Sequence, residues 1–392
     1  AVGDFGAFRA PEVKVTAVYD DELARAIGEA CREAGVDGGT AAPREPQLDH
    51  GTMVPLRFLQ EVTPACKVVR IGLSGMSPLQ HYRFGVSIAL AAERLGRRVV
   101  HIASGDLSHK LLPEGPYGFA AEGPTFDREC MAALGSGDFL RLLSIDPALS
   151  EGAAECGLRS FWIMAGVLDG LSVHAEALSY EGPFGVGYGV AAFRVTGVDA
   201  SRRIGEAFAA AEAARQEARR AAEDDYVKLA RYSLETFVKT RQRAALPEAL
   251  LPALTTRRAG VFVSLKKDGQ LRGCIGTFQP TTASVAEEIV QNAVSAGAED
   301  PRFSPVEPEE LADLVYSVDV LTPPESVEDE TALDAAKYGI IVEGMGGRRG
   351  LLLPALPGVN DVAEQVTIAR KKGGIGANEP VKLYRFEVVR HH

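Results

Sequence analysis

The chain has 392 residues, of which 46% are hydrophobic and 24% charged, and its formal net charge is -11 at pH 7. This length exceeds one ordinary hydrophobic core, so we expect two domains. The negative charge argues against nucleic acid as the main partner, and no apolar run or signal peptide indicates a membrane or secreted protein. The five cysteines include no Cys-x-x-Cys pair. That pattern indicates neither a disulfide framework nor a structural zinc site, and it favours the reducing cytoplasm.

Strands and helices alternate in the first hundred residues. The predicted elements are a strand at 13–19, a helix at 20–34, a strand at 67–73, a helix at 78–95 and a buried strand at 99–103. This alternation predicts an α/β domain with a mainly parallel, doubly wound sheet covered by helices on both faces.

The strand at 99–103 ends at a Ser-Gly-Asp turn. It is therefore expected to deliver Asp106, Ser108 and His109 to the carboxyl edge of the sheet, where open α/β folds bind ligands. His109 can change charge near neutral pH, which makes it a candidate base or metal ligand. A helix-capping histidine is the alternative.

Four more candidates lie outside this strand. His50 sits between Asp49 and a glycine in a predicted short turn, where a carboxylate can fix the tautomer of the imidazole. Tyr117 belongs to a turn-rich, aromatic stretch that either walls a pocket or is a plain surface loop. Glu155 and Cys156 open an apolar helix, whose amino terminus would lower the thiol pKa and allow Cys156 to bind a soft metal. A small buried cysteine is the alternative.

Several of these segments resemble the B-subunit family of class III extradiol ring-cleaving dioxygenases and the Memo-like proteins. The resemblance covers residues 1–198 and rests on Asp49-His50-Gly51, on Ala103-Ser104-Gly105-Asp106-Leu107-Ser108-His109, and on Glu155-Cys156-Gly157 with Phe184-Gly185-Val186-Gly187-Tyr188. It implies a doubly wound α/β domain whose dioxygenase members bind non-haem Fe(II) through two histidines and a glutamate. It further implies His109 as catalytic base, His50 as the substrate-side histidine and Glu155 or Cys156 as metal ligand. We expect Asp106, Ser108 and Tyr117 to bind the substrate.

The sequence departs from this family in one respect. Family members carry a His-Pro-Pro-like and a Ser-Pro-His-Gly-like metal ligand ahead of the loop that corresponds to residues 3–5, and neither motif occurs in these 392 residues. We therefore expect a strand-helix-strand unit of roughly 30 residues or more to belong upstream. Fe(II) is the cofactor that the resemblance implies, but two of its three ligands are missing from this sequence.

Residues 199–224 are rich in Ala, Glu and Arg and are predicted to form a connecting helix with charge pairs at four-residue spacing. A second domain is expected at 225–392. Its clearest element is a hairpin in which an apolar strand at 260–265 and a charged turn precede Leu271-Arg272-Gly273-Cys274-Ile275-Gly276. Arg272, Cys274 and Arg302 are candidates for an anion- or thiol-based site, with a packed cysteine as the alternative.

The Leu-Arg-Gly-Cys-Ile-Gly run and Asp300-Pro301-Arg302-Phe303 are similar to the AMMECR-type domain. This resemblance implies an α+β domain of two subdomains and a radical S-adenosylmethionine protein as partner. Two functions remain open. One is an Fe(II)-dependent extradiol-type dioxygenase, an oxidoreductase acting on a catechol-like or other small aromatic substrate. The other is a non-catalytic metal-binding or scaffold protein that works with the radical enzyme. A homo-oligomer is compatible with both.

Overall fold

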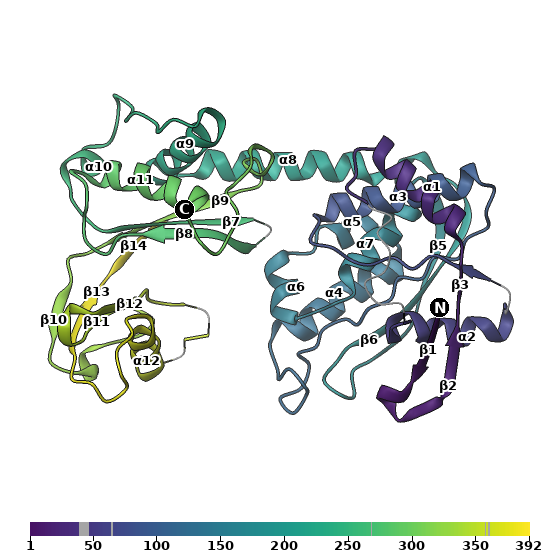
Figure 1. The fold of residues 1–392 in the computed structure, drawn as a ribbon. Helices are drawn as coiled ribbons and strands as arrows, with labels where there is room; N and C mark the ends of the chain where they lie inside the picture. The colour runs from purple at the N-terminus through teal and green to yellow at the C-terminus, as the bar shows by residue number, and fades with distance from the viewer. Residues whose placement is uncertain (39–46, 64–65, 268, 357, 360) are drawn as a thin grey trace. The chain divides into compact units, whose positions relative to one another are not determined.

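The computed structural model describes residues 1–38, 47–63, 66–267, 269–356, 358–359 and 361–392 (Figure 1). The chain divides into two compact units, Ala1–Ala213 and Ala214–His392. The division falls inside helix α8 (Ile204–Ala222), which occupies the segment predicted to be a connecting helix. The predicted α/β class of the first unit and α+β class of the second are confirmed. Within the described ranges, no helix is long and apolar enough to cross a membrane.

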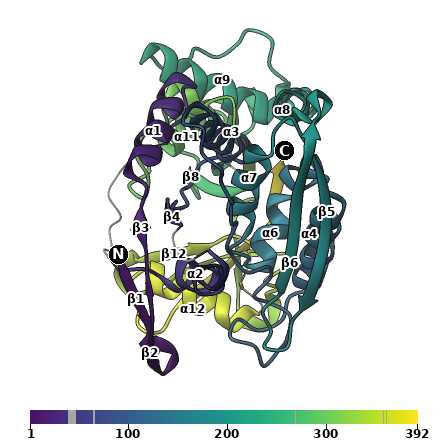
Figure 2. The same ribbon diagram turned by 90° about the vertical axis from the view of Figure 1, so that its right-hand side faces the viewer.

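Within its described residues, the first unit combines helices with three separate two-stranded sheets. Its helices ahead of α8 are α1 (Asp21–Glu33), α2 (His50–Val62), α3 (Pro78–Arg94), α4 (Glu122–Ser136), α5 (Phe139–Leu143), α6 (Pro147–Ala153) and α7 (Leu158–Val167). Its strands are β1 (Val2–Phe5), β2 (Ala10–Thr16), β3 (Val18–Tyr19), β4 (Lys67–Val68), β5 (Leu171–Glu181) and β6 (Tyr188–Val198). The β1–β2 and β5–β6 pairs are antiparallel, and the β3–β4 pair is parallel. Figure 2 shows the long β5–β6 hairpin beside α4.

The prediction of a buried strand at 99–103 is wrong. These residues carry no strand pairing, and Val99, Val100 and Ile102 are 44%, 77% and 42% exposed. A β-branched run becomes a strand only where a neighbouring strand accepts and donates its ladder hydrogen bonds. In the described part of this unit, β3 and β4 are the only strands that pair in parallel. Of the strand predicted at 67–73, only Lys67 and Val68 are paired.

Two glycines bring α3 and α7 into close contact. A β-carbon at Gly85 would lie 2.0 Å from the carbonyl oxygen of Ile163, and one at Gly166 would lie 1.9 Å from that of Tyr82. Only glycine permits so close an approach of two backbones. The contact fixes α7, and with it the position of the residues that precede this helix.

In the part of the second unit that the structure describes there are two antiparallel sheets, of strand order β14-β9-β7-β8 and β10-β13-β11-β12. The strands are β7 (Val261–Lys267), β8 (Gln270–Gly276), β9 (Val315–Leu321), β10 (Glu325–Val327), β11 (Gly339–Glu343), β12 (Arg349–Leu352), β13 (Lys382–Phe386) and β14 (Val388–His391). The helices that follow α8 are α9 (Asp225–Thr240), α10 (Pro252–Thr256), α11 (Val285–Ala298) and α12 (Val362–Lys372). Strands β7 and β8 form the predicted hairpin. Helices α9 and α11 pack their apolar side chains against one face of the first sheet.

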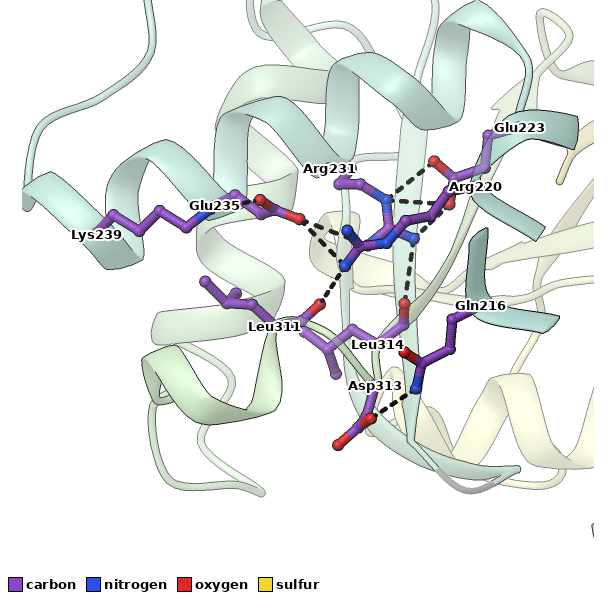
Figure 3. Close-up of polar contacts among 9 residues, drawn as sticks. All are labelled: Gln216, Arg220, Glu223, Arg231, Glu235, Lys239, Leu311, Asp313 and Leu314. Atoms are coloured by element: carbon purple, nitrogen blue, oxygen red, sulfur yellow. Dashed lines mark hydrogen bonds and ion pairs between the residues drawn. The ribbon is translucent and has the colours of Figure 1, made fainter. Parts of the chain in front are cut away.

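Arg231 of α9 forms a buried ion pair with Glu223, which precedes this helix, and a hydrogen bond with Leu314, which precedes β9 (Figure 3). Arg231 donates to both carboxylate oxygens of Glu223, with 2.9 Å between Nε and Oε2, and to the carbonyl oxygen of Leu314 at 3.2 Å. Its guanidinium also lies 4.3 Å from the ring centroid of Tyr316. The side chains of Arg231 and Glu223 are only 13% and 8% exposed, so each charge is compensated mainly by its partner and hardly by water.

Replacing Glu223 by Gln should lower the free energy of unfolding by about 3 kcal/mol, because it leaves Arg231 buried without its nearest counter-charge. Differential scanning calorimetry of the full chain measures the loss. Glu235→Gln is the matched control, since Glu235 lies 3.6 Å from Arg231 but is more exposed. It should cost less than about 1 kcal/mol. Equal losses in the two variants would contradict the prediction.

Candidate metal site

The turn that follows residue 103 is held by buried groups. The backbone N–H of Ser108 donates to Oδ1 of Asp127 at 2.7 Å, and the Ser108 hydroxyl donates to the carbonyl oxygen of Ala153 at 3.0 Å. The hydroxyl of Tyr180 donates to the other oxygen of Asp127 at 2.7 Å. Burial raises the pKa of Asp127, although both hydrogen bonds oppose the shift. These contacts fix the turn against the interior of the unit.

Three possible metal ligands meet at this turn. Asp106, His109 and Cys156 each bring one donor atom to within 4.8 Å of the other two. Nε2 of His109 lies 3.4 Å from Oδ2 of Asp106 and 3.8 Å from Sγ of Cys156. Around a tetrahedral ion with bonds of about 2.0–2.3 Å, donor atoms are separated by roughly 3.3–3.8 Å. The arrangement therefore fits one metal ion and leaves a position for water or substrate.

Glycines allow the turn that carries Asp106 and His109 to lie close to the segment that carries Cys156. A β-carbon at Gly105 would lie 2.4 Å from the α-carbon of Gly157. The backbone N–H of Asp106 consequently reaches Sγ of Cys156 at 3.2 Å. A larger residue at either glycine would push Cys156 away from His109.

Cys156 does not have the lowered thiol pKa that its position before α7 predicts. Partial burial raises the pKa of Cys156, and the negative charges of Asp106 and Glu155 raise it further, although the backbone N–H of Asp106 opposes them. Glu155 turns away to the helix end, where its Oε2 accepts a hydrogen bond from the backbone N–H of Leu158 at 2.6 Å. Of the two alternatives for the ligand, Cys156 is the one that lies in the cluster.

The remaining candidates of the first unit lie in different surroundings. Tyr117 is exposed and stacks on His109, with ring centroids 5.0 Å apart and planes at 20°. Ser108 is fully buried and uses its hydroxyl within the protein, so it does not face solvent.

His50 begins α2, where a short turn was predicted, because Asp49 caps that helix by accepting from Thr52 N at 2.8 Å. The imidazole of His50 packs edge-on against Phe8, with centroids 5.9 Å apart, and is outside the cluster of three ligands.

The three candidates of the second unit lie close together. Arg302 donates to the carbonyl oxygen of Cys274 at 3.0 Å, and the guanidinium groups of Arg272 and Arg302 lie 6.0 and 5.4 Å from the ring of Phe303. Arg272 is held by Glu310 through two hydrogen bonds of 3.0 and 2.9 Å. Sequence reasoning missed Glu310, because no local pattern links residues 38 positions apart.

The fold and the ligand cluster define an α/β domain with a candidate metal centre, followed by an α+β domain. Residues 1–191 match the family described as the catalytic LigB subunit of aromatic ring-opening dioxygenase, and residues 227–391 match the AMMECR1 family. The chain therefore belongs to the family that joins these two domains.

Some relatives cover almost the whole chain, and others cover less than half of it. A protein of Clostridium acetobutylicum is 41% identical over 397 residues, which cover 99% of this chain and 84% of that protein. A protein of Thermotoga maritima is 49% identical over 171 residues, which cover 43% of this chain and 98% of the relative. A crystal structure of a protein from Pyrococcus horikoshii is 34% identical, covers 42% of this chain and 88% of its own, and has a TM-score of 0.40.

Acidification should destabilise the second unit through Glu310. The hydrogen bonds from Arg272 lower the pKa of Glu310 from 4.5 to about 2, against the opposing effect of burial. A lowered folded-state pKa stabilises the fold above the unfolded value, so this contribution should disappear between about pH 4.5 and pH 2. Urea unfolding of the full chain measures it. Glu310→Gln should remove this dependence of the unfolding free energy on pH, and the control Glu309→Gln, at the neighbouring position, should keep it. Identical profiles in the two variants would refute the assignment.

Proposed function

We propose that the first unit is a metal-dependent oxidoreductase of the extradiol-dioxygenase type that acts on a catechol-like or other small aromatic substrate. The observation that carries the proposal is the convergence of Asp106, His109 and Cys156 on one point. The match to the LigB family supports the reaction type. The exposed ring of Tyr117 beside His109 supports an aromatic substrate, because a flat apolar surface borders the ligand cluster.

The donor set suits a transition metal. An imidazole and a thiolate favour ions such as Fe(II) or Zn²⁺ over Mg²⁺ or Ca²⁺, which prefer oxygen alone. This set of ligands differs from the two histidines and one glutamate that the resemblance implies. Within the described residues, the three groups that meet are a carboxylate, an imidazole and a thiol. Either ion would supply Lewis-acid chemistry, and only Fe(II) would add redox chemistry.

Each candidate residue of the first unit has a separate role in this proposal. Nε2 of His109 faces both Asp106 and Cys156, so we assign this nitrogen to the metal and not to the catalytic base that the resemblance implies. Tyr117 would stack against the substrate ring. His50 remains the candidate for orienting the substrate, because its neighbour Gly51 lies next to Ser104 at the start of the same turn.

Anaerobic titration of the full chain with Fe(II), followed by metal analysis, tests the site. We expect one ion per chain, and Cys156→Ala and His109→Gln should each weaken binding at least about 100-fold. Glu155→Gln is the control, because glutamine keeps an oxygen that can accept from Leu158 and removes only a carboxylate outside the cluster. Loss of iron in Glu155→Gln with retention in Cys156→Ala would overturn the assignment. No uptake by the unaltered chain would favour the non-catalytic scaffold.

Oxygen consumption with catechol as the probe tests the reaction. Tyr117→Ala should raise KM several-fold with little change in kcat, since stacking on the ring is lost equally from the ground state and the transition state. Tyr117→Phe, which keeps the ring, should behave like the unaltered protein. A fall in kcat at constant KM would assign Tyr117 to the chemical step instead.

A further inference from the structure

The second unit carries a thiol on the sheet face that α9 and α11 leave uncovered. Ser264 on β7 is directly opposite Cys274 on β8 and Ser317 on β9. The flanking residues Val263 and Leu265 point into the core beneath the helices. Because side chains alternate along a strand, Ser264 and Cys274 face the other way, and both are partly exposed.

Two groups donate hydrogen bonds to Cys274, one to its sulfur and one to its carbonyl oxygen. The hydroxyl of Ser264 lies 3.2 Å from Sγ and donates to it. Arg302 donates to the carbonyl oxygen of the same cysteine, and its side chain is 53% exposed. The pKa of Arg302 is raised, first by its hydrogen bond to Asp300 and also by its interaction with Cys274. A hydroxyl donor and a guanidinium are the neighbours that stabilise a thiolate.

A buried carboxylate holds this arrangement in place. Asp300 accepts the backbone N–H of Cys274 at 2.9 Å and two guanidinium hydrogen bonds from Arg302, at 2.9 and 2.7 Å. Its side chain is almost completely buried. Arg302 is therefore fixed beside Cys274, with part of its side chain open to solvent.

Three other cysteines, Cys31, Cys130 and Cys156, lie in less favourable surroundings. Cys31 and Cys130 are fully buried, and burial raises the pKa of both thiols. Cys156 is exposed but lies beside the carboxylate of Asp106. Cys274 differs from these three cysteines in having a hydroxyl donor on its sulfur and a guanidinium beside it, which are neighbours that favour a reactive thiol.

We propose that Cys274 is a nucleophilic thiol for small carboxylate-bearing electrophiles, with Arg302 binding the carboxylate and Ser264 donating to the sulfur. In the reaction with iodoacetate as the probe, the thiolate forms a carbon–sulfur bond while the carbon–iodine bond breaks. Iodide leaves with the electron pair, and the proton of the thiol passes to solvent. This site is in the second unit and does not depend on the metal assigned to the first.

Iodoacetate and iodoacetamide have nearly the same shape and differ in charge. The ratio of their alkylation rates therefore reports the electrostatic potential at each thiol. We measure both rates on the full chain by mass spectrometry of the peptides that contain Cys274 and Cys156. The iodoacetate-to-iodoacetamide rate ratio should be at least about 5-fold higher at Cys274 than at Cys156, as expected for a cation a few ångströms away. Arg302→Gln should abolish the difference, and Arg302→Lys should retain most of it. Ser264→Ala should slow both reagents at Cys274 by a similar factor.

Equal ratios at the two cysteines, or an unchanged ratio in Arg302→Gln, would overturn the proposal. If Arg302→Gln fails to fold by circular dichroism, the salt dependence of the unaltered chain decides, because added salt screens an exposed charge. The preference of Cys274 for iodoacetate must then shrink as salt is added. A preference that does not respond to salt would exclude Arg302 as its source.

Discussion

A buried carboxylate that accepts a backbone N–H underlies the candidate site in each unit. Asp127 accepts from Ser108 in the turn that carries Asp106 and His109, and Asp300 accepts from Cys274 itself. Both carboxylates are almost completely buried, and a buried acceptor without partners would be costly. The surrounding donors must therefore stay in place, which keeps the reactive side chains in a constant geometry.

Close backbone contact is the second shared requirement. In the first unit, Gly105 lies against Gly157 and brings Cys156 to the turn. In the second unit, a β-carbon at Gly273 would lie 2.1 Å from the carbonyl oxygen of Ala296, so β8 can lie directly on α11 only because glycine precedes Cys274. The glycines beside the candidate residues thus serve packing, and the polar residues between them remain available for chemistry.

The two sites differ in the chemistry that they support. Asp106, His109 and Cys156 face one another and suit a shared cation. Cys274 is surrounded by donors and a guanidinium, which suit an anion and a nucleophilic sulfur. The two units of this chain therefore present cysteines with different neighbours, and the tests of the two sites can succeed or fail independently.

The sequence by itself determined the features that depend on short-range patterns. These are the two fold classes, the helix at 204–222, the β7–β8 hairpin, and the three-residue spacing that places Asp106 near His109. Tertiary structure decided the rest. The run at 99–103 has strand-forming residues but no strand paired with it. The helix that begins at His50, where a short turn was predicted, is different, because its cap by Asp49 is a local signal. Cys156 and Asp106 are 50 positions apart, and Asp127 and Ser108 are 19 apart. Contacts over such separations depend on how helices and loops pack, which no local pattern of residues encodes.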